Sequence, residues 1–342
     1  MMKPLAISTG DPGGVGPEIA ARAMASLPAE DTAFVFGDAG VMRARMEGLG
    51  LGARSVREGS EGTLRPGQIG LVHVVDWTPE MLGHAPTAAG GGAQLSALAG
   101  ATQAVMAGKA RALVTAPMSK AAVNLSGRAF RGHTEYLAER AGLADDEVTM
   151  MFLGPRLRVA LVTTHLSIAE APGAITVDRV ARTIGHLGFA LARLAPAGGA
   201  RTPRVLVAGL NPHAGEGGLF GDEELSTVAP ALRRMAMQPP FADGSVRLEG
   251  PFGAETAFRM AADSPCDGVV AMLHDQATVP SKLLDWGRAV NVTWGLPFVR
   301  TSVDHGVAYD AARDGVADAD AMCAAVRMAR ELTSRRDTLP SL

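Results

Sequence analysis

Five of the eight histidines in this 342-residue chain lie in short segments rich in Gly, Pro, Thr, Asn and acidic residues. Three of them, His165, His213 and His274, each follow an apolar run that is typical of a strand. Open α/β sheets bind ligands at the carboxyl ends of their strands, so these imidazoles could converge there. Three neutral imidazoles with one open position suit a catalytic divalent metal such as zinc. The alternative is that each is an ordinary hydrogen-bonded loop histidine.

A second group of residues is cationic and polar, and it suits a phosphate. An arginine fork pairs with two phosphate oxygens, a lysine adds a point charge, and hydroxyl groups bind the remaining oxygens. Solvated surface positions are the alternative interpretation. The group comprises Lys282, Asn291, Arg300, Thr301 and Ser302, joined by His133 and Thr134.

A third group is the acidic, glycine-flanked segment 304–318. An acid near a turn, such as Asp304 or Asp310, can bind ribose hydroxyls, and Gly306 lets the backbone approach a flat base. A capped surface helix is the alternative interpretation, and from the residues alone it is the favoured one.

The N-terminal stretch STGDPGGVGPE, residues 8–18, has the order strand, glycine-rich loop, helix. Such loops often bind phosphate at the helix N-terminus. The dinucleotide fingerprint GxGxxG fails here, because Ile19 stands where the third glycine is required. Pro17 and Glu18 instead suit the first turn of a helix. We therefore expect a tight strand-to-helix turn and no pyrophosphate site.

The elements that must position these groups alternate along the chain between short apolar runs and longer helical patterns. This alternation predicts an α/β fold with a mainly parallel sheet. Three Gly/Pro-rich stretches, 54–67, 195–203 and 238–244, are expected to be surface connections. The apolar run before the N-terminal loop and the segments 33–36, 71–75, 112–114, 149–153, 159–163, 205–208, 268–273 and 290–293 are predicted strands, and the segments 93–107, 177–194 and 318–332 are predicted helices.

Composition narrows the possible partners. Apolar residues make up 47% of the chain, charged residues 20%, and the net charge is -3. These proportions are typical of a globular protein and give no electrostatic reason to expect nucleic acid or an anionic membrane as a partner. No apolar window is long enough to span a membrane, so we expect a cytoplasmic protein. Cys266 and Cys323 are far apart, which argues against a disulfide or a thiolate metal site.

Taken together, the motifs resemble those of the 4-hydroxythreonine-4-phosphate dehydrogenase family of pyridoxal phosphate biosynthesis. The matching segments are GDPGGVGPE, TAPMSK, GHTEYLAE, TTHL, GLNPHAGEGG, AMLHDQ and GLPFVRTSVDHG. The resemblance implies a two-lobed α/β fold similar to that of isocitrate and isopropylmalate dehydrogenases, with an active-site cleft between the lobes and no Rossmann fold. It places 1–125 with 288–342 in one lobe, on the cofactor side, and 126–287 in a central lobe that carries the metal and the dimer contacts.

The resemblance also assigns roles to residues. His165, His213 and His274 would bind a divalent metal, zinc first with Mg, Mn or Co as alternatives, and one ligand would come from the partner subunit of a homodimer with shared active sites. His133, Thr134, Lys282, Asn291 and Arg300 would bind the substrate phosphate. The general base stays open among Lys120, Asp275 and Glu255. The residues expected to bind NAD or NADP are Gly295, Leu296, Asp304, His305, Gly306 and Asp310.

The activity that the resemblance implies is the oxidation of a phosphorylated 3-hydroxy acid followed by decarboxylation. The expected substrate is 4-phosphooxy-L-threonine, which would give 3-amino-2-oxopropyl phosphate and CO2. D-threonate or D-erythronate 4-phosphate is the alternative substrate, because Glu255 and Trp294 depart from the usual family pattern. A non-catalytic small-molecule binding protein on a similar fold is the alternative from another class.

Overall fold

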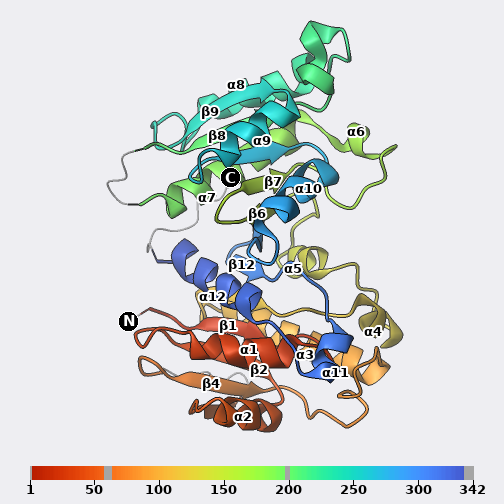
Figure 1. Cartoon of the computed structure of the whole chain (residues 1–342), viewed down its shortest axis with the longest axis vertical. Coiled ribbons are helices and arrows are strands. Elements are labelled where there is room, and N and C mark those ends of the chain that lie inside the picture. Colours follow the sequence, from red (N-terminus) through yellow and green to blue (C-terminus); the bar gives the residue numbers. More distant parts are fainter. Residues whose placement is uncertain (1, 58–63, 197–200, 335–342) are drawn as a thin grey trace. The chain divides into compact units, whose positions relative to one another are not determined.

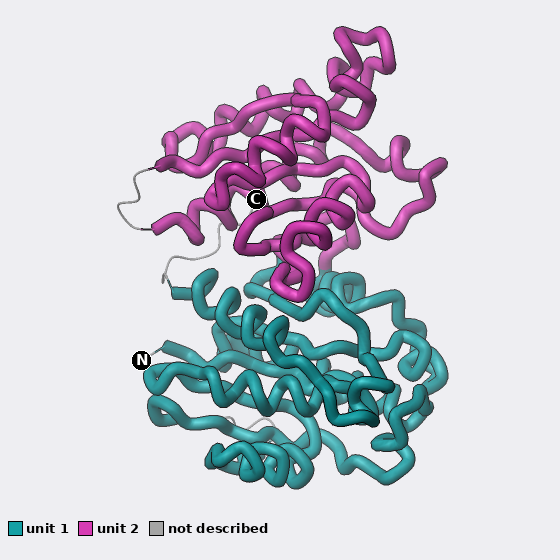
Figure 2. The backbone as a smooth tube through the Cα atoms, viewed as in Figure 1, with its two compact units in different colours: residues 1–142, 296–339 teal, residues 143–295, 340–342 magenta. Residues whose placement is uncertain are grey.

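The computed structural model describes residues 2–57, 64–196 and 201–334. The chain divides into two compact units, shown in Figure 2. Unit 1 contains the described residues up to Gly142 and from Leu296 on, and unit 2 contains Leu143–Gly295. The expected lobe boundaries near residues 125 and 288 lie somewhat earlier. The later second boundary follows from strand pairing, since residues 290–294 pair with 149–153 inside unit 2.

The sheet of unit 1 has the strand order β3-β4-β2-β1-β5-β12, and its strands all run parallel. The first strand, β1, is buried at every position and lies between β2 and β5, which makes it a central strand. Buried parallel strands need continuous apolar runs, and this strand provides one. The strands are β1 (Leu5–Ser8), β2 (Ala33–Gly37), β3 (Arg54–Arg57), β4 (Ile69–His73), β5 (Ala112–Thr115) and β12 (Val299–Ser302).

The helices of unit 1 cover both faces of its sheet. The connections through α1 and α3 step across the sheet in opposite directions, and right-handed crossovers then place these two helices on opposite faces. Helix α12 packs against α1 and so shares its face, as Figure 1 shows. The helices are α1 (Gly16–Ala25), α2 (Ala39–Gly48), α3 (Ala88–Met106), α4 (Lys120–Leu125), α5 (His133–Arg140), α11 (Tyr309–Asp314) and α12 (Asp320–Leu332).

The sheet of unit 2 is mixed, with the order β11-β6-β7-β10-β8-β9. Strand β6 runs antiparallel to both of its neighbours, whereas β7, β10, β8 and β9 are parallel. The prediction of a mainly parallel sheet is confirmed with this one exception. A short turn after β6 leads directly into β7, and a connection of that length permits only antiparallel pairing. The strands are β6 (Thr149–Leu153), β7 (Arg158–Leu161), β8 (Arg204–Ala208), β9 (Arg247–Phe252), β10 (Gly268–Ala271) and β11 (Val290–Trp294).

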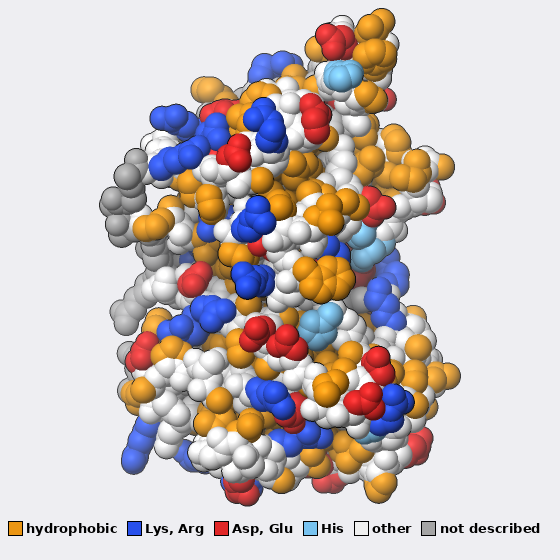
Figure 3. Space-filling model, viewed as in Figure 1, with side chains coloured by type: hydrophobic (Ala, Val, Ile, Leu, Met, Phe, Trp, Pro, Cys, Tyr) orange, Lys and Arg blue, Asp and Glu red, His pale blue; other side chains and the backbone are white. Residues whose placement is uncertain are grey.

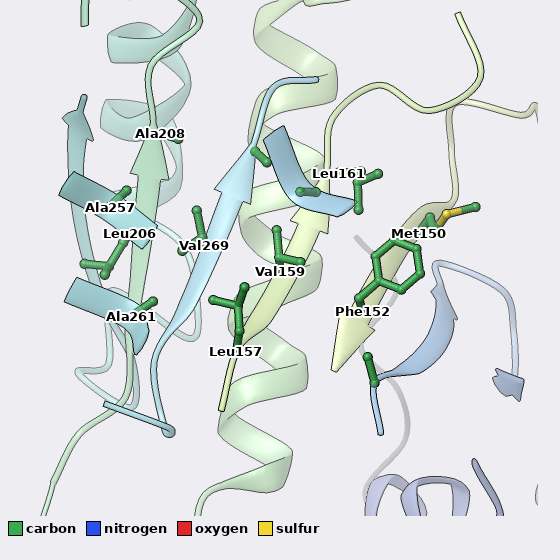
Figure 4. Close-up of a cluster of buried hydrophobic side chains, with 13 residues drawn as sticks. Met150, Phe152, Leu157, Val159, Leu161, Leu206, Ala208, Ala257, Ala261 and Val269 are labelled. Atoms are coloured by element: carbon green, nitrogen blue, oxygen red, sulfur yellow. The ribbon is translucent and has the colours of Figure 1, made fainter. Parts of the chain in front are cut away.

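Helices of unit 2 pack on this sheet, and an apolar cluster lies between the sheet and α9. Helix α7 packs on β7, β10 and β8, and α9 packs on β8 and β10. Figure 4 shows side chains of β6, β7, β8, β10 and α9 meeting in a cluster that includes Phe152, Val159 and Leu206. The helices are α6 (Ala171–Ala174), α7 (Val177–Leu194), α8 (Ala229–Ala236), α9 (Ala254–Ala262) and α10 (His274–Asp285), with a π-helical turn at Glu224–Val228 before α8.

Three strands lack a sequence prediction. Strands β3 and β9 end their sheets, and their side chains are mostly exposed or half-buried, so neither has a continuous apolar run. The prediction that 54–67 is a surface connection was therefore wrong for Arg54–Arg57, and 58–63 lie outside the described residues. Strand β12 is fully buried but contains Arg300, Thr301 and Ser302. Residues 238–244 form turns as predicted, and part of 195–203, residues 197–200, is not described.

On the face in Figure 3, acidic and basic side chains are interspersed, and neither sign dominates. Within the described ranges, no helix is long and apolar enough to cross a membrane.

Candidate active site

Two of the three candidate metal ligands lie together in unit 2. His165 follows β7 and His274 follows β10, and these strands are parallel neighbours. Thr163 ties the two strand ends together, because its backbone N–H and its hydroxyl both donate to the Met272 carbonyl. The ring centroids of His165 and His274 are 5.7 Å apart. The expectation that strand ends bring imidazoles together therefore holds for this pair.

The His274 ring is oriented by the residues that follow it. Its Nδ1 lies 2.7 Å from Oδ1 of the exposed Asp275, a contact that leaves Nε2 as the nitrogen available to a metal. Gln276 fixes the start of α10. Its Oε1 accepts the N–H groups of Met272 and Leu273, and its Nε2 donates to the Gly209 carbonyl at the end of β8.

The third candidate, His213, lies on a left-handed turn after β8. Residues 213–217 all have positive φ, although three of them are not glycine. The exposed ring of His213 is 6.2 Å from the ring of Phe220. Among the described residues, no group of three or more His, Cys, Asp or Glu side chains is arranged to hold a metal ion. Within one chain, the rings of His165 and His274 therefore lie together, and His213 does not complete a group of three.

A buried carboxylate, that of Glu224, holds the His213 turn. Its side chain is 3% exposed. Oε1 accepts the backbone N–H groups of Leu210 and Asn211 at 2.7 and 2.8 Å, and Oε2 accepts the side-chain amide of Asn211 at 3.0 Å. Three such bonds offset the cost of burying the charge. Sequence reasoning missed Glu224. The feature that could have indicated it is the acidic pair Glu223 and Glu224, just after a glycine-rich turn.

The candidate base Glu255 lies at the start of α9 and is exposed. The hydrogen bond from the Thr256 hydroxyl is the main cause that lowers the Glu255 pKa, and the charge of His213 adds to it. Glu255 is therefore an electrostatic neighbour of His213, and its carboxylate is a weakened base.

In unit 1, His133 lies close to the buried cation Arg300. Arg300 is 2% exposed and donates through Nε and a terminal nitrogen to the Thr115 hydroxyl at 3.2 and 2.8 Å. Burial lowers the Arg300 pKa to about 9, which still leaves the guanidinium charged at neutral pH. Burial, with the charges of Arg300 and Lys120, holds the His133 pKa well below its usual range. The shielded Nε2 of His133 has no hydrogen-bond partner among the described residues.

An unpaired nitrogen close to the cations Arg300 and Lys120 suits an anion, because a buried polar atom without a partner is costly. Thr134 is the second residue of α5, directly after His133. The two other predicted phosphate ligands belong to unit 2. Lys282 lies on α10, with Nζ 5.5 Å from the Trp286 ring centroid. Asn291 lies on β11, and its shielded Oδ1 has no hydrogen-bond partner among the described residues.

The predicted cofactor residues have differing surroundings. His305, Gly306 and Asp310 are exposed, Asp304 is half-buried, and a Cβ placed on Gly306 would meet no atom within 4 Å. This open backbone has room for a flat base. Leu296 is 3% exposed. A Cβ on Gly295 would lie 2.6 Å from the Glu147 carbonyl oxygen, so packing alone requires glycine there.

The N-terminal glycine loop forms the expected tight turn. The N–H of Asp11 donates to the Pro117 carbonyl, that of Gly13 to the Asp11 carboxylate, that of Gly14 to the Asp11 carbonyl and that of Val15 to the Val307 carbonyl. These four donors are therefore engaged within the protein.

Comparison with known proteins decides the family. Residues 29–329 match the family model described as "Pyridoxal phosphate biosynthetic protein PdxA". The chain belongs to this family. A 4-hydroxythreonine-4-phosphate dehydrogenase of Geobacter metallireducens is 41% identical over 96% of this chain and 95% of its own length.

Solved structures agree with this PdxA membership. A 4-hydroxythreonine-4-phosphate dehydrogenase from Burkholderia phymatum superimposes with a TM-score of 0.78 at 36% identity, covering 98% of this chain and 100% of its own. A terephthalate 1,2-cis-dihydrodiol dehydrogenase from Burkholderia xenovorans gives a TM-score of 0.70 at 30% identity, covering 97% and 98%. The predicted α/β fold is thus confirmed as that of the PdxA structures, whereas a shared fold leaves the substrate open.

Proposed function

We propose that this chain is a metal-dependent, NAD(P)-linked dehydrogenase that oxidises and decarboxylates 4-phosphooxy-L-threonine to 3-amino-2-oxopropyl phosphate and CO2. The observation that carries the phosphate part is the shielded Nε2 of His133, close to Arg300 and Lys120, for which the described part of the chain offers no hydrogen-bond partner. Membership in the PdxA family supports the reaction type.

The phosphate is assigned to His133, Thr134 and Arg300, together with Lys282 and Asn291. Arg300 is held in place by Thr115, so little side-chain entropy is lost when an anion binds. The pKa of His133 is low in the empty site, because burial and two cations oppose its protonation. An incoming dianion would reverse that balance and favour a proton on Nε2.

The metal is assigned to His165 and His274 of one subunit with His213 of its partner. The rings of His165 and His274 already lie together, and Asp275 orients the second, which fits the demands of a zinc-type site. When bound, the metal would lower the pKa of the substrate hydroxyl. NAD(P) would accept a hydride from the carbon that carries this hydroxyl. The β-keto acid so formed then loses CO2.

The base that removes the hydroxyl proton is assigned to Lys120 by elimination. Asp275 is engaged with Nδ1 of His274, and Glu255 accepts the Thr256 hydroxyl, which weakens it as a base. Lys120 begins α4 and is close enough to His133 to affect its pKa. As a neutral amine, its Nζ would take the proton from the hydroxyl of a bound substrate, so Lys120 must first release the proton that makes it a cation in the empty site.

Two features of unit 2 support the proposal of a homodimer with shared sites. His213 is exposed on a projecting turn and lacks the other two imidazoles within its own chain. Helix α10, which begins at His274, exposes Val279 and Leu283, and Trp286 directly after it is exposed as well, the last two at 79% and 78%. Exposed apolar side chains on one helix are typical of an interaction surface.

D-threonate 4-phosphate and D-erythronate 4-phosphate are the alternative substrates. Each carries a hydroxyl group where 4-phosphooxy-L-threonine carries its amino group. The residues assigned to the phosphate argue against an unphosphorylated cis-dihydrodiol as substrate, because His133 and Arg300 would then face no phosphate. A binding protein without activity is the alternative of another class.

A rate comparison separates these possibilities. The chain is supplied with a divalent metal, NAD or NADP and each phospho-acid in turn, and the absorbance of the reduced nicotinamide is followed. We expect the highest kcat/KM with 4-phosphooxy-L-threonine. A higher value with a sugar-acid phosphate would reassign the substrate, and no turnover with any of them would favour the binding protein.

A further inference from the structure

The proposed reaction leaves unused a buried acid in the glycine loop, Asp11. Its side chain is 2% exposed. The carboxylate accepts three hydrogen bonds: from the Gly13 N–H at 2.9 Å, from Nε2 of Gln94 at 3.0 Å and from the Tyr309 hydroxyl at 2.8 Å. A buried carboxylate with three donors drawn from three parts of unit 1 is a fixed junction.

One arm of the junction reaches the segment assigned to the cofactor. Tyr309 begins α11, directly after 304–308, and its hydroxyl bonds to Asp11 across almost the whole sequence. Burial raises the pKa of Asp11 and that of Tyr309. The hydroxyl therefore stays protonated as a donor at neutral pH.

The backbone strengthens this arm. The Val15 N–H donates to the Val307 carbonyl at 2.9 Å. A Cβ on Gly14 would lie only 2.7 Å from the same carbonyl oxygen, so glycine is required for the approach. On its other side, the loop is held by Nδ1 of His84, 2.8 Å from the Gly13 carbonyl.

The other arm reaches the start of α4. Gln94 donates to Asp11, and its Oε1 accepts the Ser119 N–H at 2.7 Å. The Ser119 hydroxyl caps α4 by accepting the Ala122 N–H, and Ser119 is close enough to Tyr309 to affect the Tyr309 pKa. The residue after Ser119 is Lys120.

We propose that Asp11 is a positioning residue that, through Tyr309, Gln94 and Ser119, holds segment 304–310 and the start of α4 in one arrangement, so that bound NAD(P) and Lys120 are aligned together. The proposal rests on the proposed function for the cofactor and base assignments. The junction itself is independent of them. Ordering of the segment before binding would raise the affinity for NAD(P), because only the ordered fraction of the protein binds.

The test compares Tyr309→Phe with the wild type. This change removes one hydroxyl from a half-exposed side chain and keeps its ring, so the fold should persist. We expect NAD affinity, measured by titration calorimetry, to fall about tenfold, which corresponds to loss of one hydrogen bond to a charged group. Amide hydrogen exchange in 304–312 should become faster. Asp38→Asn is the control for Asp11→Asn, since the buried Asp38 also accepts three hydrogen bonds, in its case from the backbone N–H groups of Gly40, Val41 and Trp77.

A double-mutant cycle then tests the coupling. With Asp11→Asn present, adding Tyr309→Phe should have little further effect on NAD affinity, because both changes break the same bond. Additive effects, or unchanged exchange in Tyr309→Phe, would overturn the proposal. If the wild type itself bound no NAD(P), the cofactor assignment of the proposed function would be overturned. Hydrogen exchange would then still decide whether the junction orders the segment.

Discussion

Asn211 donates its backbone N–H to Oε1 of Glu224 and its side-chain amide to Oε2 of the same carboxylate, at 2.8 and 3.0 Å. The turn that presents His213 begins at this contact. Residues 213–217 occupy the left-handed region, which costs free energy for residues other than glycine. The buried carboxylate compensates for that cost.

Glu224→Gln should therefore weaken metal binding. The glutamine amide would present donors to the Asn211 amide, which is itself a donor, and the turn would lose one bond. We expect zinc affinity, measured by competition with a chelator, to fall about tenfold, within the range for residues that support metal ligands. Glu216→Gln makes the same chemical change on an exposed side chain of the same turn, and it should leave the affinity unchanged. Equal affinities in both variants would contradict a role for Glu224.

Replacing His165, His213 or His274 with Ala should each remove bound metal and activity. His73→Ala is the control, because His73 is an exposed histidine of unit 1 outside the proposed site. Metal content measured by atomic emission checks the outcome. A His213→Ala protein with full metal content would refute its assignment as a ligand.

Mixing two inactive variants tests the shared site. In a hybrid of one His165→Ala and one His213→Ala subunit, one of the two metal sites would carry both substitutions. The other site would carry neither and would keep all three histidines, because His213 comes from the opposite subunit. Activity should then reappear on mixing and subunit exchange. Its continued absence in hybrids shown to form would argue that His213 serves its own chain.

His133→Ala should weaken the binding of phosphorylated substrate about tenfold to a hundredfold, since a bond to a charged group is lost beside Arg300. The metal content should stay at the wild-type level. Inorganic phosphate is a simple probe, and its affinity should fall in parallel with that of the substrate. A variant whose affinity for both matches that of His73→Ala would show that the unpaired nitrogen does not bind phosphate.

His186 predicts a pH dependence of stability. It is buried in unit 2 with Nδ1 2.8 Å from the Thr149 hydroxyl, and burial lowers its pKa from 6.5 to about 3. Above pH 6.5 both folded and unfolded states hold the neutral ring. Below it, the unfolded state binds a proton that the folded state does not, so stability falls toward pH 3 by up to about 1.4 kcal/mol per pH unit.

Urea unfolding of the wild type and of His186→Gln at several pH values checks this contribution. Glutamine can keep the bond to Thr149 but does not titrate. As the pH falls below 6.5, the unfolding free energy of the wild type should decrease more than that of the variant. Parallel pH curves would mean that His186 is protonated in the folded state.

The sequence predicts the buried strands well and the others poorly, for a physical reason. Strands such as β6 (Thr149–Leu153) are buried throughout, and an apolar run marks them. Edge strands β3 and β9 bury only part of their surface, so their residues resemble a loop. Strand β12 is buried yet polar, because it carries Arg300 into the proposed phosphate site.

The candidate site divides in the same way. The histidines at strand ends could be found from the sequence, because topology brings the ends of β7 and β10 together. Asp11, Glu224 and Tyr309 could not be assigned, since their partners lie far away in the sequence or depend on the path of a turn. The only hints are an acid inside a glycine loop and one of just two tyrosines in the chain.

The pairing of β12 with β5 also has a consequence for biosynthesis. On the ribosome, the residues of unit 2 emerge as one uninterrupted segment and can collapse around their own core. The sheet of unit 1 must wait, with one side of β5 uncovered, until residues 299–302 have been translated. A chain stalled before residue 299 would therefore leave the sheet of unit 1 without its last strand.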